Sequence, residues 1–323
     1  MASYVVVLTS NLIALRSRGF LPLIKSMKKT LLTLLIPCAF SVNAAYEQAH
    51  DPHVVGTLPK VTCQTTIVEP PVPPGEVHNP DGYYDSALNK TGDELKEALN
   101  NIISTGVTKL PYSSSSFDVW DALDVTDEDP NNSSNVILMY TGRSQEKGQK
   151  TGQGNLGQDN WNREHTYPKS NGGFNNSSAS AYTDIHHLRP TDESVNSKRG
   201  NLEFDLGGNE ITEAPGNYSD GDSFEPRDEV KGDVARMMFY MATRYEGKDT
   251  SDVSNPDLEL VSSVTNNGTA LGNVCVLLEW NEQDPVDHFE FNRNSKIQKI
   301  QGNRNPFVDN PHWGDTIFEK DCK

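Results

Sequence analysis

The sequence predicts an α+β fold in which helices and short strands share one domain over residues 82 to 323. Apolar residues recur at helical spacing in three long segments, whereas the strand signal is one short apolar run. Between these segments, residues 161 to 200 form a polar motif that collects histidines, carboxylates and basic side chains. There is no internal repeat and no second motif of this density, so we expect a single domain.

The N-terminal segments differ from this domain. Residues 1 to 44 have the pattern of a secretory signal peptide, with lysines before the apolar run 31 to 40 and small residues for cleavage near Ala44. We expect translation to begin at Met27. Because the apolar run is too short to span a bilayer, the mature chain should be secreted or periplasmic without a membrane anchor. Residues 45 to 81 are rich in proline and predict an extended arm or linker.

Three segments predict helices. The first begins with a capping-box pattern at Thr91 and stops near Gly106. The second runs from about Asp228 to Gly247, with methionines along its apolar stripe as core residues. The third follows Asp284, an expected N-cap before a proline.

Shorter segments connect these helices. Residues 136 to 140 are apolar and predict a buried strand, and residues 144 to 160 predict a loop rich in Gly, Gln and Lys. Residues 273 to 280 are compatible with either a helix or a strand. Residues 301 to 307 predict a polar turn.

Three cysteines remain beyond the signal segment, namely Cys63, Cys275 and Cys322. An oxidising compartment permits one disulfide among them, and the sequence leaves all three pairings open. Because no Cys-x-x-Cys spacing occurs, we do not expect a structural zinc or redox motif.

The charge of the chain is strongly acidic, with 28 Lys and Arg against 45 Asp and Glu and a net charge of −17. The signal segment holds five of the basic residues and no acidic one, which leaves −22 on the rest of the chain. Taken alone, this balance argues against a nucleic-acid partner. The motif region is different, because its five basic residues outnumber its four acidic ones.

The motif has the side chains that phosphodiester hydrolysis needs. Glu164 and the amide oxygen of Asn196 are hard ligands for Mg²⁺, which keeps most of its waters; Mn²⁺ or Ca²⁺ would also suit such a site. A neutral imidazole at His165 could take a proton from water. A strand and turn at the Glu-His pair followed by a helix at Asn196 would give a ββα arrangement.

Basic and imidazole side chains surround these residues. The candidates for phosphate or substrate contacts are Arg163, Arg189, Lys198 and Arg199, because guanidinium groups match phosphate oxygens. We expect His186 and His187 to be buried hydrogen-bonding groups that support the site, although they could also be metal ligands.

Several motifs in the same order resemble the endonuclease I family of secreted bacterial nucleases. Around the site they are Asn162-Arg163-Glu164-His165-Thr166-Tyr167-Pro168-Lys169-Ser170, Asp184-Ile185-His186-His187-Leu188-Arg189-Pro190 and Val195-Asn196-Ser197-Lys198-Arg199-Gly200-Asn201. Outside it they are Tyr83-Tyr84-Asp85-Ser86, Val230-Lys231-Gly232-Asp233-Val234-Ala235-Arg236, Tyr240-Met241-Ala242-Thr243-Arg244-Tyr245 and Gln301-Gly302-Asn303-Arg304-Asn305-Pro306-Phe307. The resemblance extends over residues 82 to 313.

This resemblance implies a ββα-metal (His-Me finger) core in which Glu164 and Asn196 hold Mg²⁺ and His165 is the general base. Some family members carry a phosphate-binding arginine in an insertion between the first two motifs. This chain has neither arginine nor cysteine over residues 171 to 183, so Arg189 is the expected catalytic phosphate contact.

The expected function is therefore that of a secreted, Mg²⁺-dependent endonuclease, acting as a monomer on DNA and also on RNA. We expect little sequence preference, because the chain has no base-reading module, and products with 5′-phosphate ends. The alternative is a non-enzymatic secreted module that binds polyanions. A zinc protease is disfavoured, because Trp161 stands where the inverted zinc motif requires histidine.

Overall fold

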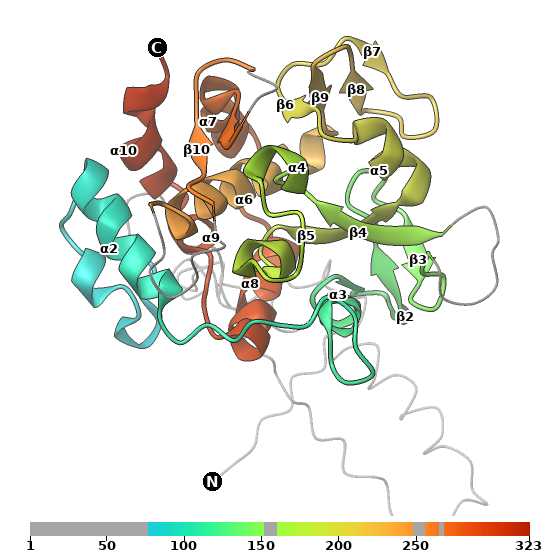
Figure 1. Ribbon diagram of the computed structural model, residues 1–323, viewed down its shortest axis with the longest axis horizontal. Helices are drawn as coiled ribbons and strands as arrows, with labels where there is room; N and C mark the ends of the chain where they lie inside the picture. The colour runs from blue at the N-terminus through green and yellow to red at the C-terminus, as the bar shows by residue number, and fades with distance from the viewer. Residues whose placement is uncertain (1–76, 152–159, 248–255, 265–267) are drawn as a thin grey trace, which may run out of the picture. The chain divides into compact units, whose positions relative to one another are not determined.

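The computed structural model describes residues 77–151, 160–247, 256–264 and 268–323 (Figure 1). The expected signal peptide and nearly all of the proline-rich arm lie outside these residues. Within them, helices and short strands alternate, which confirms the α+β fold class. Among the described helices, none is both long and apolar enough to cross a bilayer.

The helices occupy both ends of the described chain and its centre. They are α2 (Gly92–Ser104), α3 (Val119–Thr126), α4 (Lys169–Gly172), α5 (Glu193–Arg199), α6 (Lys231–Arg244), α7 (Val274–Gln283), α8 (His288–Gln301), α9 (Pro306–Asp309) and α10 (Trp313–Phe318). Short 3₁₀ helices add η4 (Pro80–Gly82), η5 (Asp85–Ala87), η6 (Ser180–Thr183), η7 (Asp228–Val230) and η8 (Glu319–Asp321).

The strands in the described part of the chain are short and form four small sheets. The first has the order β1 (Glu128–Asp129), β2 (Asn132–Ile137) and β3 (Ser144–Glu146), and β4 (Trp161–His165) pairs with β5 (Leu188–Asp192). The third sheet has the order β6 (Glu203–Phe204), β9 (Ser223–Glu225), β8 (Tyr218–Ser219) and β7 (Asn209–Glu210). In the last sheet β10 (Glu259–Leu260) runs parallel to β11 (Ala270–Leu271).

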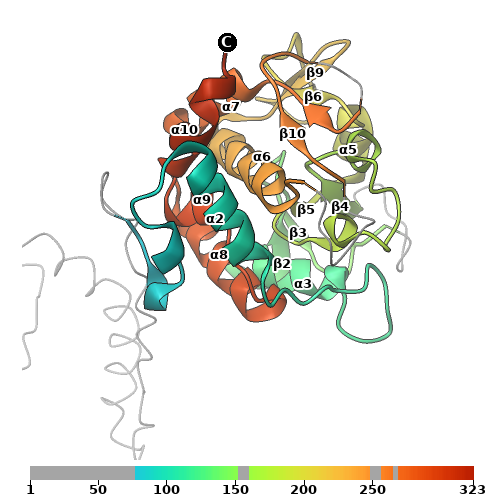
Figure 2. The ribbon, with the colours of Figure 1, turned by 60° about the vertical axis from the view of Figure 1, so that its left-hand side comes forward.

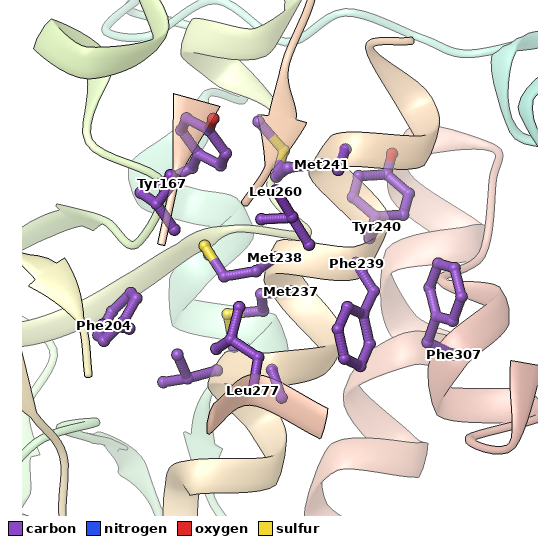
Figure 3. Packing of buried hydrophobic residues seen from close by; sticks show 14 of the residues in the cluster. Tyr167, Phe204, Met237, Met238, Phe239, Tyr240, Met241, Leu260, Leu277 and Phe307 are labelled. Carbon is purple, nitrogen blue, oxygen red and sulfur yellow. The ribbon is translucent and has the colours of Figure 1, made fainter. Parts of the chain in front are cut away.

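Helix α6 is the centre of the main hydrophobic core. Its apolar side chains pack against residues of several other elements, including Phe204, Leu277 and Phe307 (Figure 3). All fourteen residues of α6 are buried, so the helix has no solvent face. The sequence predicts burial of an apolar stripe only. The polar side chains of α6 are also buried because they have partners in the interior, as Arg236 has in Glu290.

The second structural unit that positions the site is the pair β4–β5 followed directly by α5 (Figures 1 and 2). The two strands are antiparallel, with Glu164 opposite Arg189 and His165 opposite Leu188. The connection between them contains α4 and η6, and α5 starts at the residue after β5. Strand, strand and helix therefore follow one another in the order that the motif predicts.

Several element boundaries differ from expectation. Only the first two residues of the apolar run 136 to 140 belong to β2, where they are its last two residues. Residues 138 to 140 are buried and lead into a turn before Gly142. The predicted loop 144 to 160 opens with β3, and residues 152 to 159 lie outside the described chain. The ambiguous segment 273 to 280 is helical.

The C-terminal predictions also need correction. Helix α8 begins after Asp287, whose carboxylate caps it, because Asp284 instead accepts a hydrogen bond from the backbone of Gly232. The expected polar turn 301 to 307 is buried, and Arg304 pairs there with Asp309. At the capping box of α2, Thr91 is the N-cap residue without a side-chain hydrogen bond.

The disulfide joins Cys275 of α7 to Cys322, near the end of the chain. This selects one of the three pairings that the sequence leaves open. Cys63 lies outside the described residues.

Candidate active site

The motif residues line one pocket of about 590 Å³. Strand β4 forms its floor, and α4, α5 and the segment before α3 form its walls. The lining residues are Tyr112, Trp120, Thr151, Asn162, Arg163, Glu164, His165, Pro168, Lys169, Ser170, Asn196, Gly200 and Asn201. The pairing of β4 with β5, and the contacts of α5 with both strands, bring Asn196 of α5 to the same pocket as the residues of β4.

Glu164 is held at one carboxylate oxygen only. Its Oε1 accepts hydrogen bonds from the Tyr140 hydroxyl at 2.7 Å and from the Arg199 guanidinium at 2.9 Å. The side chain is 2% exposed, and burial raises the pKa of Glu164 while Arg199 and Tyr140 oppose that shift. Among the described residues nothing bonds to Oε2, so this oxygen is the one available to the pocket.

Asn196 offers a second oxygen from α5. Its Nδ2 donates to the side-chain oxygen of Asn162 at 2.7 Å, which leaves the amide oxygen of Asn196 free of that bond. A carboxylate oxygen and an amide oxygen in one pocket are hard ligands. This donor set fits Mg²⁺, which binds through few protein ligands and keeps several waters.

His165 has a defined tautomer. Its Nε2 lies 2.9 Å from the backbone carbonyl of Tyr182, and because a carbonyl only accepts, Nε2 carries the proton. The Nδ1 lone pair is therefore the basic one. Burial, and next the neighbouring His187, lower the pKa of His165 well below its usual range, so the ring is neutral at pH 7. A neutral imidazole lining a pocket beside a carboxylate can act as a general base.

Two of the expected substrate-binding arginines are structural instead. Arg189 is 2% exposed and pairs with Asp127 at 2.7 Å and Asp233 at 2.9 Å, so it does not line the pocket. This corrects its assignment as the catalytic phosphate contact. Arg199 is completely buried, and besides Glu164 it donates to the carbonyl oxygens of His165 and Thr166. Both guanidinium groups are buried and bound to protein partners, so neither is available to a substrate phosphate.

The other two expected substrate-binding residues differ from each other. Lys198 is exposed on α5, pairs with Glu213 at 2.9 Å and does not line the pocket. Arg163 does line it. Its guanidinium carbon lies 3.4 Å from the ring centre of Tyr112 and 4.0 Å from that of Trp120, so the group packs against both aromatic rings.

His186 and His187 are both buried hydrogen-bonding groups, as expected for supporting residues. Nε2 of His186 lies 3.2 Å from the carbonyl of Asn303, and Nε2 of His187 lies 2.8 Å from the carbonyl of Ala181. Neither lines the pocket. Burial lowers the pKa of each ring to about 4, with the nearby Asp184 opposing the shift.

These depressed pKa values predict acid sensitivity of the fold. An unfolded histidine titrates near 6.5, so between about pH 6.5 and 4 the unfolded chain binds more protons and stability falls as the pH falls. We expect His187→Gln, whose amide can still donate to Ala181, to reduce this slope by about 1.4 kcal/mol per pH unit. Denaturant unfolding at pH 7 and pH 4.5 measures it, and equal slopes in variant and wild type would contradict it.

Two site residues have no clear sequence signal of their function. Tyr140 ends an apolar run, a pattern that predicts only a core residue, but its hydroxyl donates a hydrogen bond to Glu164. Asn162 is within the motif, yet nothing in the pattern shows that it orients Asn196 on a helix 34 positions away. Both contact a metal-ligand candidate through a side-chain hydrogen bond.

Comparison with known proteins places this site in a family context. A family model described as Endonuclease I matches residues 91–312. An extracellular ribonuclease of Bacillus subtilis (strain 168) is 57% identical over 74% of this chain and 78% of its own length, and an extracellular ribonuclease of Bacillus amyloliquefaciens is 57% identical over 73% and 78%. An extracellular deoxyribonuclease of Aeromonas hydrophila is 29% identical over 39% of this chain and 48% of its own.

Proposed function

Because the chain belongs to the endonuclease I family, we propose that it is a secreted nuclease that hydrolyses phosphodiester bonds in RNA and DNA with the help of a divalent cation. The 57% identity to two proteins named extracellular ribonucleases supports RNA as a substrate, and the more distant deoxyribonuclease supports DNA. We propose little sequence preference, action as a monomer and products with 5′-phosphate ends.

One observation carries this proposal: a candidate base and two candidate metal ligands line the same pocket. His165 contributes Nδ1, Glu164 contributes Oε2 and Asn196 contributes its amide oxygen. Three other pockets of the described chain, lined by His186, by Thr141 and by Ser114, have no histidine beside a carboxylate oxygen that lacks a hydrogen bond.

In the proposed mechanism His165 takes the proton of the attacking water at Nδ1, while Tyr182 keeps the ring oriented through Nε2. Glu164 and Asn196 would hold Mg²⁺, which supplies electrostatic stabilisation of the phosphorane and of the leaving oxygen. Tyr140 and Arg199 fix Glu164 from behind, so the carboxylate does not rotate away from the pocket. In this proposal the strands β4 and β5 and the helix α5 form a ββα-metal core that carries Glu164, His165 and Asn196.

The stacked Arg163 suits a substrate contact. Its guanidinium is immobilised by Tyr112, whose backbone oxygen accepts one of its N–H groups, and by the face of Trp120. A pre-oriented guanidinium loses little rotamer entropy when it binds a phosphate oxygen. We therefore retain Arg163 as a substrate-binding residue.

The alternative function is a secreted module that binds polyanions without cleaving them. It requires a basic surface, whereas two arginines of the motif, Arg189 and Arg199, are neutralised by buried carboxylates. Purified protein incubated with total RNA and with plasmid DNA decides between the two. We expect both substrates to be degraded with Mg²⁺ and to stay intact with EDTA. Binding without cleavage in Mg²⁺ would support the alternative.

A further inference from the structure

We propose that Lys169 contacts the scissile phosphate and supplies the positive charge that this chain lacks over residues 171 to 183. The inference rests on the proposed nuclease function. Lys169 is not among the substrate-binding residues expected from the sequence, and its ammonium would replace the phosphate contact that the buried, paired Arg189 cannot provide.

Few basic side chains near the site are available to a phosphate. Within the described chain only two basic side chains line the pocket, Arg163 and Lys169. Arg199 is neutralised by Glu164, and Arg163 is fixed against Tyr112 and Trp120 at a substrate contact of its own. Lys169 is exposed, and among the described residues no carboxylate pairs with it. An ammonium without a counter-ion at a pocket rim is ready to bind an anion.

Lys169 also lies close to His165, the candidate base. Pro168 has an extended backbone and ends the strand region, so that Lys169 starts α4 on the rim of the pocket. Its Nζ lies 5.5 Å from the ring centre of Tyr182, the residue whose carbonyl orients His165. After burial and His187, the charge of Lys169 contributes to lowering the pKa of His165. The ammonium is therefore on the same side of the pocket as the base.

The reaction requires a further positive charge near the phosphate. A phosphodiester carries one negative charge, and a second develops as hydroxide adds. The Glu164 carboxylate offsets one charge of the bound cation, so a further cation at the non-bridging oxygens is needed for electrostatic stabilisation. An ammonium has three rotatable donors on a long stem and can follow these oxygens from ground state to transition state.

The test compares Lys169→Gln, Lys169→Arg and the control Lys90→Gln. Lys90 is an exposed lysine before α2 that does not line the pocket, so its replacement makes the same change of net charge. Two properties are measured for each variant. One is kcat/KM on RNA and on plasmid DNA with Mg²⁺, and the other is binding of a single-stranded DNA oligonucleotide in EDTA over a range of salt concentrations.

We expect Lys169→Gln to lower kcat/KM by about 10²-fold, as for loss of one transition-state donor, with an unchanged melting temperature. Lys169→Arg should retain activity within about tenfold, and Lys90→Gln within about threefold. In EDTA, Lys169→Gln should reduce the magnitude of the slope of log K against log salt by about 0.7, the value for one phosphate contact on a single strand.

Wild-type rates and an unchanged salt slope for Lys169→Gln would overturn the inference, as would an equal loss in Lys90→Gln. Failure of the proposed function is distinguishable, because wild-type protein would then leave RNA and DNA intact with Mg²⁺. The salt slope in EDTA still tests Lys169 in that case, since it needs no cleavage.

Discussion

Replacing His165 by alanine is expected to lower kcat/KM for RNA and DNA by about 10²- to 10⁴-fold, the contribution of a positioned general base. The variant removes the Nδ1 lone pair of a side chain that lines the pocket and the Nε2–H that donates to Tyr182. Because the side chain lies in the pocket wall and carries no ion pair, the fold should persist. Steady-state kinetics at saturating Mg²⁺, with circular dichroism of each variant, measures the effect.

Two controls separate a chemical role from a structural one. His312→Ala removes an exposed histidine at the start of α10, and it should retain wild-type rates. Added imidazole should restore part of the activity of His165→Ala, since the variant leaves a cavity in which a free base can bind. A folded His165→Ala protein with wild-type kcat/KM would exclude this residue as the base.

The second large effect is expected on stability, at Arg199. Arg199→Met leaves the Glu164 carboxylate buried without its cation, and it also removes donors to the carbonyl oxygens of His165 and Thr166. Breaking a buried pair by removing one partner typically costs about 3–5 kcal/mol, because an uncompensated charge remains in the interior. Denaturant unfolding at pH 7 should show this loss in the free energy of unfolding.

The neighbouring residue provides the matched control. Lys198 is exposed and pairs with Glu213, so Lys198→Met should change stability by less than about 1 kcal/mol. The double variant Glu164→Gln with Arg199→Met should be more stable than Arg199→Met alone, since no buried charge is left unpaired. A loss below about 1 kcal/mol for Arg199→Met would contradict the view that this pair supports the site.

The sequence predicts the local part of the site well, because that part is encoded by neighbouring residues. The Glu164-His165 pair ends β4, and Asn196 lies on the helix that directly follows β5. Motif order and helix signals are enough to predict this strand, strand and helix succession. The same is true of α2, whose buried face consists of regularly spaced apolar residues.

The roles of the arginines could not be predicted in this way. A guanidinium that binds phosphate and one that closes a buried ion pair have the same sequence pattern, and the partners decide between them. Those of Arg189 are Asp127 and Asp233, which are distant along the chain. The complete burial of α6 could not be predicted for the same reason. The polar residues of this helix have the pattern of a solvent-exposed face, and only their partners show that they are buried.

The central claim is that Glu164 and Asn196 hold a divalent cation in the pocket of His165. Mn²⁺ binding, counted by electron paramagnetic resonance of the free ion, tests it without reference to activity. The control Glu259→Gln perturbs a separate carboxylate cluster, where Glu246, Asp257 and Glu259 have oxygens within 4.8 Å of one another. We predict one tight site in wild type and in Glu259→Gln, weaker binding in Asn196→Ala and none at that affinity in Glu164→Gln. Undiminished binding in a folded Glu164→Gln protein would contradict the account.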